Sequence, residues 1–215
     1  LPQGIEGLHV LDLGCGSGRD CYVASKLVGP TGRVTGVDMT PQQLEVARKH
    51  QDAYASTIGY ANMDFIQGTI EDLSAIPSDS IDIIISNCVV NLSPDKPAVL
   101  KEAYRVLRHG GEFYFSDVYG DRRLPKALTQ HKVLVGECIG GALYEQDFLR
   151  IARRVGFEDP RVLDSAPIDV KDPQLIELVG EAKFTSVTYR LFKLPGLLES
   201  LCEDYGQVAV YKGTV

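Results

Sequence analysis

The chain has 215 residues, 44% of them hydrophobic and 24% charged, and its formal net charge is −7 at pH 7. A chain of this length can bury a large core, whereas the acidic balance argues against a nucleic-acid backbone as partner. It holds no apolar run long enough to span a bilayer and no signal-peptide pattern, and its five cysteines are too few and scattered for a disulfide framework. We therefore predict a cytoplasmic protein with no nucleic-acid or membrane partner, and we expect native N-terminal sequence to be missing before Leu1.

Strand and helix signals alternate in the first half of the chain. Short apolar runs predict strands at 9–13, 33–37, 63–67, 81–86 and 112–117. Helical patterns lie at 20–27, after Thr40 and at 96–107. Thr40 is the expected N-cap of the second helix, with Pro41 at its first position and Gln43 completing a capping box. This alternation predicts a parallel α/β sheet with right-handed crossovers.

The pattern changes after Tyr119. Helices are expected at 124–135 and 145–155, and strands at 161–165, 184–192 and 207–213. Repeats and linkers are absent from the sequence, so we predict one domain over 1–215, with a core at about 1–120 and an extension at about 121–215. We expect the extension to add strands to the sheet edge and to cover the ligand crevice.

A glycine-rich turn, Gly14-x-Gly16-x-Gly18, follows the first predicted strand. Such a turn lets the backbone approach a ligand at a helix N-terminus, although it can equally be a plain tight turn. Asp12 precedes it, and Asp38 ends the second predicted strand, where it can accept hydrogen bonds from ribose hydroxyls. The glycine spacing differs from the G-x-G-x-x-G dinucleotide fingerprint, which argues against NAD.

The stretch DIIISNCVVNL (residues 82–92) begins as a buried strand and places Asn87 and Cys88 where that strand ends. Ligands of open α/β sheets bind at the carboxyl ends of the strands, so this thiol faces the expected site. The alternative is that Cys88 only packs, as most buried cysteines do.

These features resemble the class I methyltransferases that use S-adenosylmethionine. The resemblance implies a Rossmann-like, doubly wound, mainly parallel α/β sheet with additional C-terminal strands and helices. It also implies that the glycine turn and Asp12 face the amino-acid part of the cofactor, and that Asn87 faces the reactive methyl group. Further cofactor contacts are implied for Asp38 and Met39 at the ribose and for Ile70 and Glu71 at the adenine, with Glu71 accepting from the exocyclic amine.

Several longer stretches resemble one family in particular, the arsenite methyltransferases. They include GRDCYV (18–23), EAYRVL (102–107), YFSDVY (114–119), HKVLVGECIGGAL (131–143) and YRLFK (189–193). The resemblance maps the arsenic-binding, catalytic thiols onto Cys88 and Cys138, within the cofactor-binding core and the arsenic-site extension respectively. The family has a further thiol ahead of the glycine turn, which this sequence lacks.

The resemblance implies transfer of methyl groups from S-adenosylmethionine to arsenite or its thiol conjugates, with glutathione or thioredoxin as thiol reductant, by a monomer. Trivalent arsenic is soft and prefers thiolates. When bound to sulfur it keeps a lone pair that can attack a sulfonium methyl group without a general base, so positioning is the protein's main task.

Two other functions remain open. One is a general small-molecule C- or O-methyltransferase with a structural Cys88, and the other is a cofactor-binding protein without catalysis. The remaining cysteines, Cys15, Cys21 and Cys202, are expected to be packing or incidental.

Overall fold

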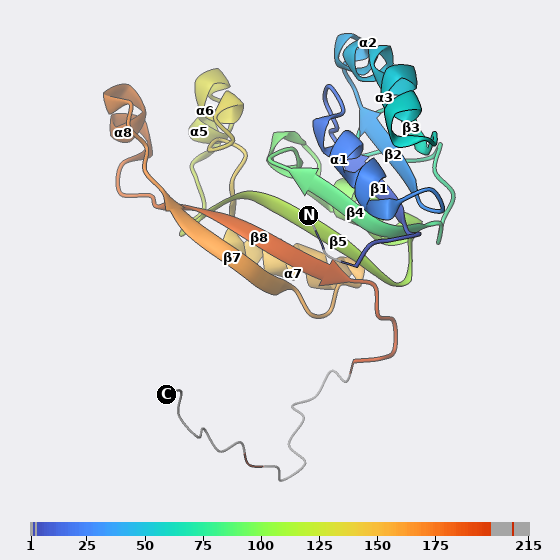
Figure 1. Ribbon diagram of the computed structural model, residues 1–215. Coiled ribbons are helices and arrows are strands. Elements are labelled where there is room, and N and C mark those ends of the chain that lie inside the picture. Colours follow the sequence, from blue (N-terminus) through green and yellow to red (C-terminus); the bar gives the residue numbers. More distant parts are fainter. Residues whose placement is uncertain (1, 3, 199–207, 209–215) are drawn as a thin grey trace, which may run out of the picture.

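The computed structural model describes residues 2, 4–198 and 208. Its centre is a sheet with strand order β3-β2-β1-β4-β5-β8-β7, to which the short β6 adds beside β5 (Figure 1). The strands are β1 His9–Leu13, β2 Arg33–Asp38, β3 Met63–Gln67, β4 Ile81–Asn87, β5 Leu107–Gly120, β6 Leu143–Tyr144, β7 Arg161–Ile168 and β8 Phe184–Phe192. The first five strands run parallel, and β8 is antiparallel to both β5 and β7.

Helices cover both faces of the sheet. They are α1 Arg19–Val28, α2 Pro41–Lys49, α3 Gln51–Ile58, α4 Lys96–Val106, α5 Lys126–Thr129, α6 Lys132–Gly136, α7 Glu145–Val155 and α8 Pro173–Val179, with a 3-10 turn at Val90–Leu92. Successive residues of β1 alternate between two cores: Val10 packs with α1 and α2, whereas Leu11 packs with α4 and α7. This alternation explains why Val10, Leu11 and Leu13 are all apolar although they face both sides of the sheet.

A smaller apolar cluster lies at the carboxyl end of β5. Val118 of β5 and Phe184 of β8 pack there with Leu134 and Ile139 around α6 and with Leu175 of α8. The cluster positions α5, α6 and α8 as two projections at this edge of the sheet (Figure 1). It thereby carries the segment after α6 towards the ends of the parallel strands.

The predicted strands at 9–13, 63–67 and 184–192 and the predicted helix at 145–155 are confirmed to the residue. The other predicted strands in the described range are confirmed with longer bounds, and the C-terminal strands do add to the sheet edge. The expected strand at 207–213 falls outside the described residues, apart from Val208.

Two local predictions are wrong. The helix expected at 124–135 is two short helices, because the chain leaves the helical conformation at His131, whose extended backbone and ring Nδ1 begin α6. Thr40 does stand at the N-cap of α2, but its side chain makes no capping hydrogen bond there. The sequence analysis also missed α3, α8 and β6. Within the part of the chain that the structure describes, no helix has the length and apolarity that crossing a membrane requires.

Candidate active site

The glycine loop, residues 14–18, connects β1 to α1 at the carboxyl edge of the sheet. All three of its glycines have left-handed backbones, with φ of 71° at Gly14, 53° at Gly16 and 83° at Gly18. A Cβ on Gly14 would lie 2.5 Å from Cγ1 of Val89, whereas one on Gly16 would meet nothing within 4 Å. Gly14 is therefore required by close packing, and the backbone at Gly16 faces open space.

Asp38 links the end of β2 to this loop. Its carboxylate accepts hydrogen bonds from the backbone N–H of Gly16 and of Thr40, both at 2.8 Å. Each carboxylate oxygen has two lone pairs, so acceptor capacity remains for ligand hydroxyls. Asp38 is half-buried and lines the adjacent cavity.

Asp12 lies beneath the loop, only 4% exposed. Burial raises the pKa of Asp12 to about 7, while a hydrogen bond donated by the Cys21 thiol at 3.3 Å opposes that rise. The sulfurs of Cys15 and Cys21 pack against β2, where a Cβ on Gly36 would lie 2.7 and 2.9 Å from them. Asp12 is therefore bonded to the Cys21 thiol in the first turn of α1.

A cavity of about 490 Å³ opens beside the loop. Of the residues expected to bind cofactor, Gly14, Asp38, Met39, Ile70 and Glu71 line it. The other described residues that line the cavity are Thr40, Gly68, Thr69, Val89, Leu92, Ser93 and Pro94. This lining does not include four residues that were expected to bind cofactor, namely Asp12, Gly16, Gly18 and Asn87. Its volume is within the range of small-molecule and cofactor sites. The cavity has a carboxylate at Asp38, a second carboxylate at Glu71 and apolar walls between them. This lining fits a nucleoside that has a ribose diol and an exocyclic amine.

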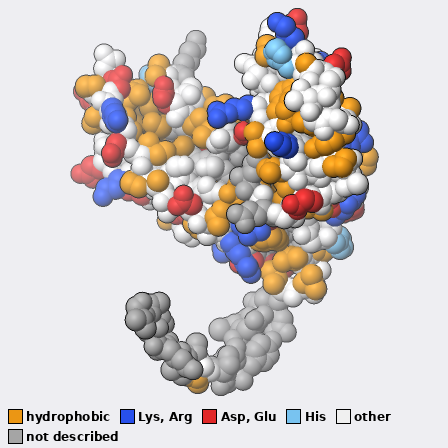
Figure 2. Space-filling view, in the orientation of Figure 1, with side chains coloured by type: hydrophobic (Ala, Val, Ile, Leu, Met, Phe, Trp, Pro, Cys, Tyr) orange, Lys and Arg blue, Asp and Glu red, His pale blue; other side chains and the backbone are white. Residues whose placement is uncertain are grey.

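The space-filling view shows a hollow between the projections that carry α5, α6 and α8 and the part that carries α2 and α3 (Figure 2). Hydrophobic side chains gather along this hollow. Met39, which lines the cavity, is 69% exposed.

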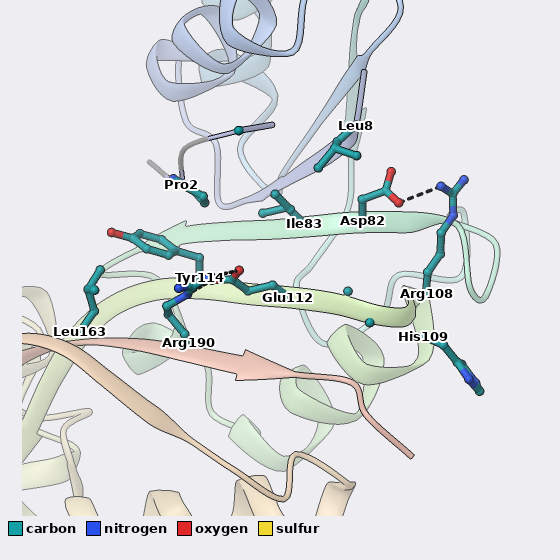
Figure 3. Close-up of a pocket in the computed structure, with 13 residues that line it drawn as sticks. Pro2, Leu8, Asp82, Ile83, Arg108, His109, Glu112, Tyr114, Leu163 and Arg190 are labelled. Atoms are coloured by element: carbon teal, nitrogen blue, oxygen red, sulfur yellow. Dashed lines mark hydrogen bonds and ion pairs between the residues drawn. The ribbon is translucent and has the colours of Figure 1, made fainter. Parts of the chain in front are cut away.

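A larger cavity, about 730 Å³, lies at the opposite edge of the sheet, at the amino ends of β4 and β5 (Figure 3). Its charged side chains form two ion pairs, Asp82 with Arg108 and Glu112 with Arg190. It is thus remote from the loops at the carboxyl ends of the strands and is not the candidate active site.

Cys88 follows β4 directly, and Cys138 follows α6. The thiol of Cys138 donates to the backbone carbonyl oxygen of Cys88 at 3.4 Å, although the two residues are fifty positions apart. We call these two cysteines the thiol pair. Their φ angles are 55° and 60°, and in the described part of the chain only one other non-glycine residue, Asp79, has a positive φ. Left-handed backbone at such residues is strained and is often found at functional sites.

The surroundings of the thiol pair raise the pKa of both thiols. Burial, followed by the nearby carboxylate of Asp117, raises the pKa of Cys138 to about 11. The same two causes raise the pKa of Cys88. Asp117 is itself 1% exposed, and burial raises its pKa to about 6.

Comparisons with known proteins identify the family to which the chain is similar. A family model described as a methyltransferase domain matches residues 5–156. Arsenite methyltransferase of Aquipseudomonas alcaligenes is 57% identical over 216 residues, covering 100% of this chain and 62% of that protein. The crystal structure of CrArsM, an arsenic (III) S-adenosylmethionine methyltransferase from Chlamydomonas reinhardtii, matches with a TM-score of 0.90 and 64% identity, covering 100% of this chain and 73% of that one.

This chain belongs to the arsenite methyltransferase family. The arsenite methyltransferase of Homo sapiens is 50% identical over 197 residues, covering 90% of this chain and 52% of that protein. The chain thus spans between about half and two thirds of the length of these curated relatives. The predicted family and the Rossmann-like α/β fold of class I methyltransferases are both confirmed.

Two buried polar residues that lie beneath the thiol pair were not predicted from the sequence of this arsenite methyltransferase family member. They are Asp117, near the carboxyl end of β5, and Asn91, in the turn after Cys88; both are buried. The sequence signals available were a carboxylate within the mostly apolar stretch 113–119 and an amide four residues after the end of a buried strand. Buried polar groups of this kind require partners.

Proposed function

We propose that this chain transfers methyl groups from S-adenosylmethionine to trivalent arsenic held by Cys88 and Cys138. The observation that carries the proposal is the approach of two left-handed cysteines, fifty residues apart, of which Cys88 directly precedes Val89 in the lining of the cavity at the glycine loop. Nothing in the local sequence brings these residues together, so the fold imposes their proximity. A ligand shared by two thiols accounts for that arrangement.

The arsenic site is proposed on the chemistry of its donors. Trivalent arsenic prefers sulfur to oxygen or nitrogen ligands. Arsenite, As(OH)₃, condenses with two S–H groups to form two As–S bonds, and each departing hydroxyl leaves as water with a thiol proton. No base is needed for this exchange, so the raised pKa values of the thiol pair do not prevent it. The role of the protein is then to hold arsenic at near-attack distance, on the order of 3–3.5 Å, from the methyl group.

The cofactor site is proposed on the lining of the 490 Å³ cavity. Asp38 would accept from ribose hydroxyls, Glu71 from the adenine amine, and Ile70 and Met39 would contact the rings. The side chain of Glu71 is oriented by the hydroxyl of Ser93, which donates to it at 2.5 Å. When bound, S-adenosylmethionine would supply an electrophilic methyl group on a sulfonium sulfur.

Asp12, Gly16, Gly18 and Asn87 would act around that cavity. The backbone N–H of Gly16 is already bound to Asp38, so Gly16 and Gly18 would shape the loop. Asp12 would support the loop from below through Cys21. Asn87, exposed at the end of β4, would stand beside the methyl group.

We base our proposals for the localisation, oligomeric state, substrate form and reductant of this chain on its resemblance to the arsenite methyltransferase family. We propose a cytoplasmic monomer that takes arsenite or its thiol conjugates and uses glutathione or thioredoxin as reductant. We also propose one domain over 1–215, in which about 1–120 binds the cofactor and about 121–215 supplies Cys138 and the sheet edge. The alternative of a general C- or O-methyltransferase is not favoured, because matches to arsenite methyltransferases extend over nearly the whole chain at 50–57% identity.

Binding of arsenite to the purified chain tests the proposal most directly. Titration calorimetry should show arsenite binding that is lost after thiol alkylation, while S-adenosylmethionine still binds. Arsenite binding that survives alkylation of Cys88 and Cys138 would contradict the proposed site.

A further inference from the structure

Asn91 is a buried amide between the two segments that carry the thiol pair. It is 4% exposed and lies three residues after Cys88, in the 3-10 turn Val90–Leu92. Its backbone N–H donates to Oδ2 of Asp117 at 2.8 Å. This bond ties the Cys88 segment to β5.

The side chain of Asn91 binds both neighbouring segments. Its Nδ2 donates to the carbonyl oxygen of Val118 in β5 at 2.6 Å and to the carbonyl oxygen of Cys138 at 3.5 Å. One amide thus contacts the strand beneath and the backbone of the second cysteine.

The backbone of Asn91 also lies directly against the segment after Cys138. A Cβ on Gly141 would lie 1.9 Å from the carbonyl oxygen of Asn91, so only glycine permits this approach. The same carbonyl oxygen accepts from Nζ of Lys96 at 3.2 Å. Asn91 is therefore held from β5, from α4 and from the Cys138 segment at once.

We propose that Asn91 is a positioning residue that fixes the separation of the Cys88 and Cys138 sulfurs, so that the thiol pair can hold one trivalent arsenic atom. The inference rests on the proposed function, and it deepens that function by assigning the residue that makes two distant thiols act as one chelate. A chelate gains affinity because the second bond forms at a high effective concentration, which depends on a fixed separation. Loss of the Asn91 side chain leaves both thiols in the chain but lets the two segments move apart.

The test measures thiol separation without arsenic. Dibromobimane joins two nearby thiols, each sulfur displacing one bromide, and peptide mapping by mass spectrometry quantifies the Cys88–Cys138 cross-link. A monofunctional bromobimane measures the reactivity of each thiol alone. The variant Asn91→Asp keeps the shape of the side chain but replaces the Nδ2 donor by an acceptor. In this variant the ratio of cross-linking to single alkylation should fall by about tenfold, and arsenite affinity should fall by a similar factor.

Asn62→Ala is the matched control. The half-buried Asn62 also donates from Nδ2 to two carbonyl oxygens, those of Ser25 and Gly29, on the other half of the sheet. It should lower thermal stability without changing the cross-linking ratio. A second variant, Gly141→Ala, separates the same two segments from the opposite side and should reproduce the effect of Asn91→Asp.

The outcomes separate this inference from the proposed function. A cross-linking ratio within about twofold of wild type in both Asn91→Asp and Gly141→Ala overturns the positioning role, even if wild type binds arsenite. A ratio that falls as expected, in a chain whose wild type does not bind arsenite, supports the positioning role and removes the proposed function. An equal fall in Asn62→Ala would mean general loosening of the fold and would also overturn the inference.

Discussion

The thiol of Cys138 donates to the carbonyl oxygen of Cys88 across 3.4 Å, and both residues have left-handed backbones. The N–H of Cys88 still donates to Ser116 of β5 at 2.9 Å, so the sheet holds the first cysteine while the cluster around α6 carries the second. The thiol pair therefore belongs to two separately supported segments.

Replacing Cys88 or Cys138 by serine should abolish tight arsenite binding and methylation, because a single thiolate holds arsenic without a chelate. Affinity for S-adenosylmethionine and the thermal unfolding temperature should stay close to wild type. Cys15→Ala, which changes a buried cysteine within the glycine loop, is the control and should retain arsenite binding. Normal arsenite turnover by Cys88→Ser would remove the proposed mechanism in favour of a general methyltransferase.

Asp38→Ala should weaken S-adenosylmethionine binding by about 1–3 kcal/mol, because it leaves ligand hydroxyls and the N–H groups of Gly16 and Thr40 without their acceptor. Titration calorimetry gives the affinity, and arsenite binding should be unchanged. The control is Asp64→Ala, which removes an exposed carboxylate paired with Arg33 at 2.7 Å. Equal cofactor affinity in the two variants would dismiss Asp38 from the ribose role.

Gly14→Ala and Gly16→Ala should differ although both residues have positive φ. Each substitution carries backbone strain of about 1–2 kcal/mol, but only the Cβ at position 14 would approach a neighbour, Val89, within 2.5 Å. Chemical denaturation should therefore show a larger loss of stability for Gly14→Ala. Comparable losses would mean that the loop relaxes around the added methyl group.

Asp12 should make the fold less stable as pH rises. Burial raises its folded-state pKa from 3.8 to about 7, so the folded chain binds the proton more tightly than the unfolded chain does. Its contribution is favourable below about pH 4, declines through pH 4–7 and is lost above pH 7, with a total change of order 4 kcal/mol. Asp12→Asn should flatten this dependence and be more stable than wild type at pH 8. Urea unfolding at pH 5, 6, 7 and 8 measures the difference, and parallel curves for the two proteins would contradict the assignment.

Much of the fold was predictable because the information is local. The alternation of apolar runs with helical patterns gave the parallel strands, and the residue type at the ends of β1, β2 and β4 pointed to the glycine loop, Asp38 and Cys88. The split between α5 and α6 was not predictable, because it depends on the extended conformation of His131. The helix α8 was missed since it has only 7 residues, too few to show a helical period, and it packs through Leu175 and Val179 on a distant cluster.

The candidate site was predictable only in part. Cys88 could be placed from its strand, but the approach of Cys138 depends on packing between β5, α6 and α8, which no local pattern encodes. Asn91 and Asp117 were missed for a similar reason. Their hydrogen bonds join residues 26 and 27 positions apart, and such partners become visible only in the folded chain.

The close contact between the backbones of Gly141 and Asn91 limits how this site could be engineered into another protein. A designer who places two cysteines at matching positions of another class I methyltransferase would copy the sulfurs but not the space that brings them together. A Cβ at Gly140 would lie 2.8 Å from the N of Val135, and one at Gly141 would overlap Asn91. The turn after β4, the α6 segment and its two consecutive glycines must therefore be grafted as one unit.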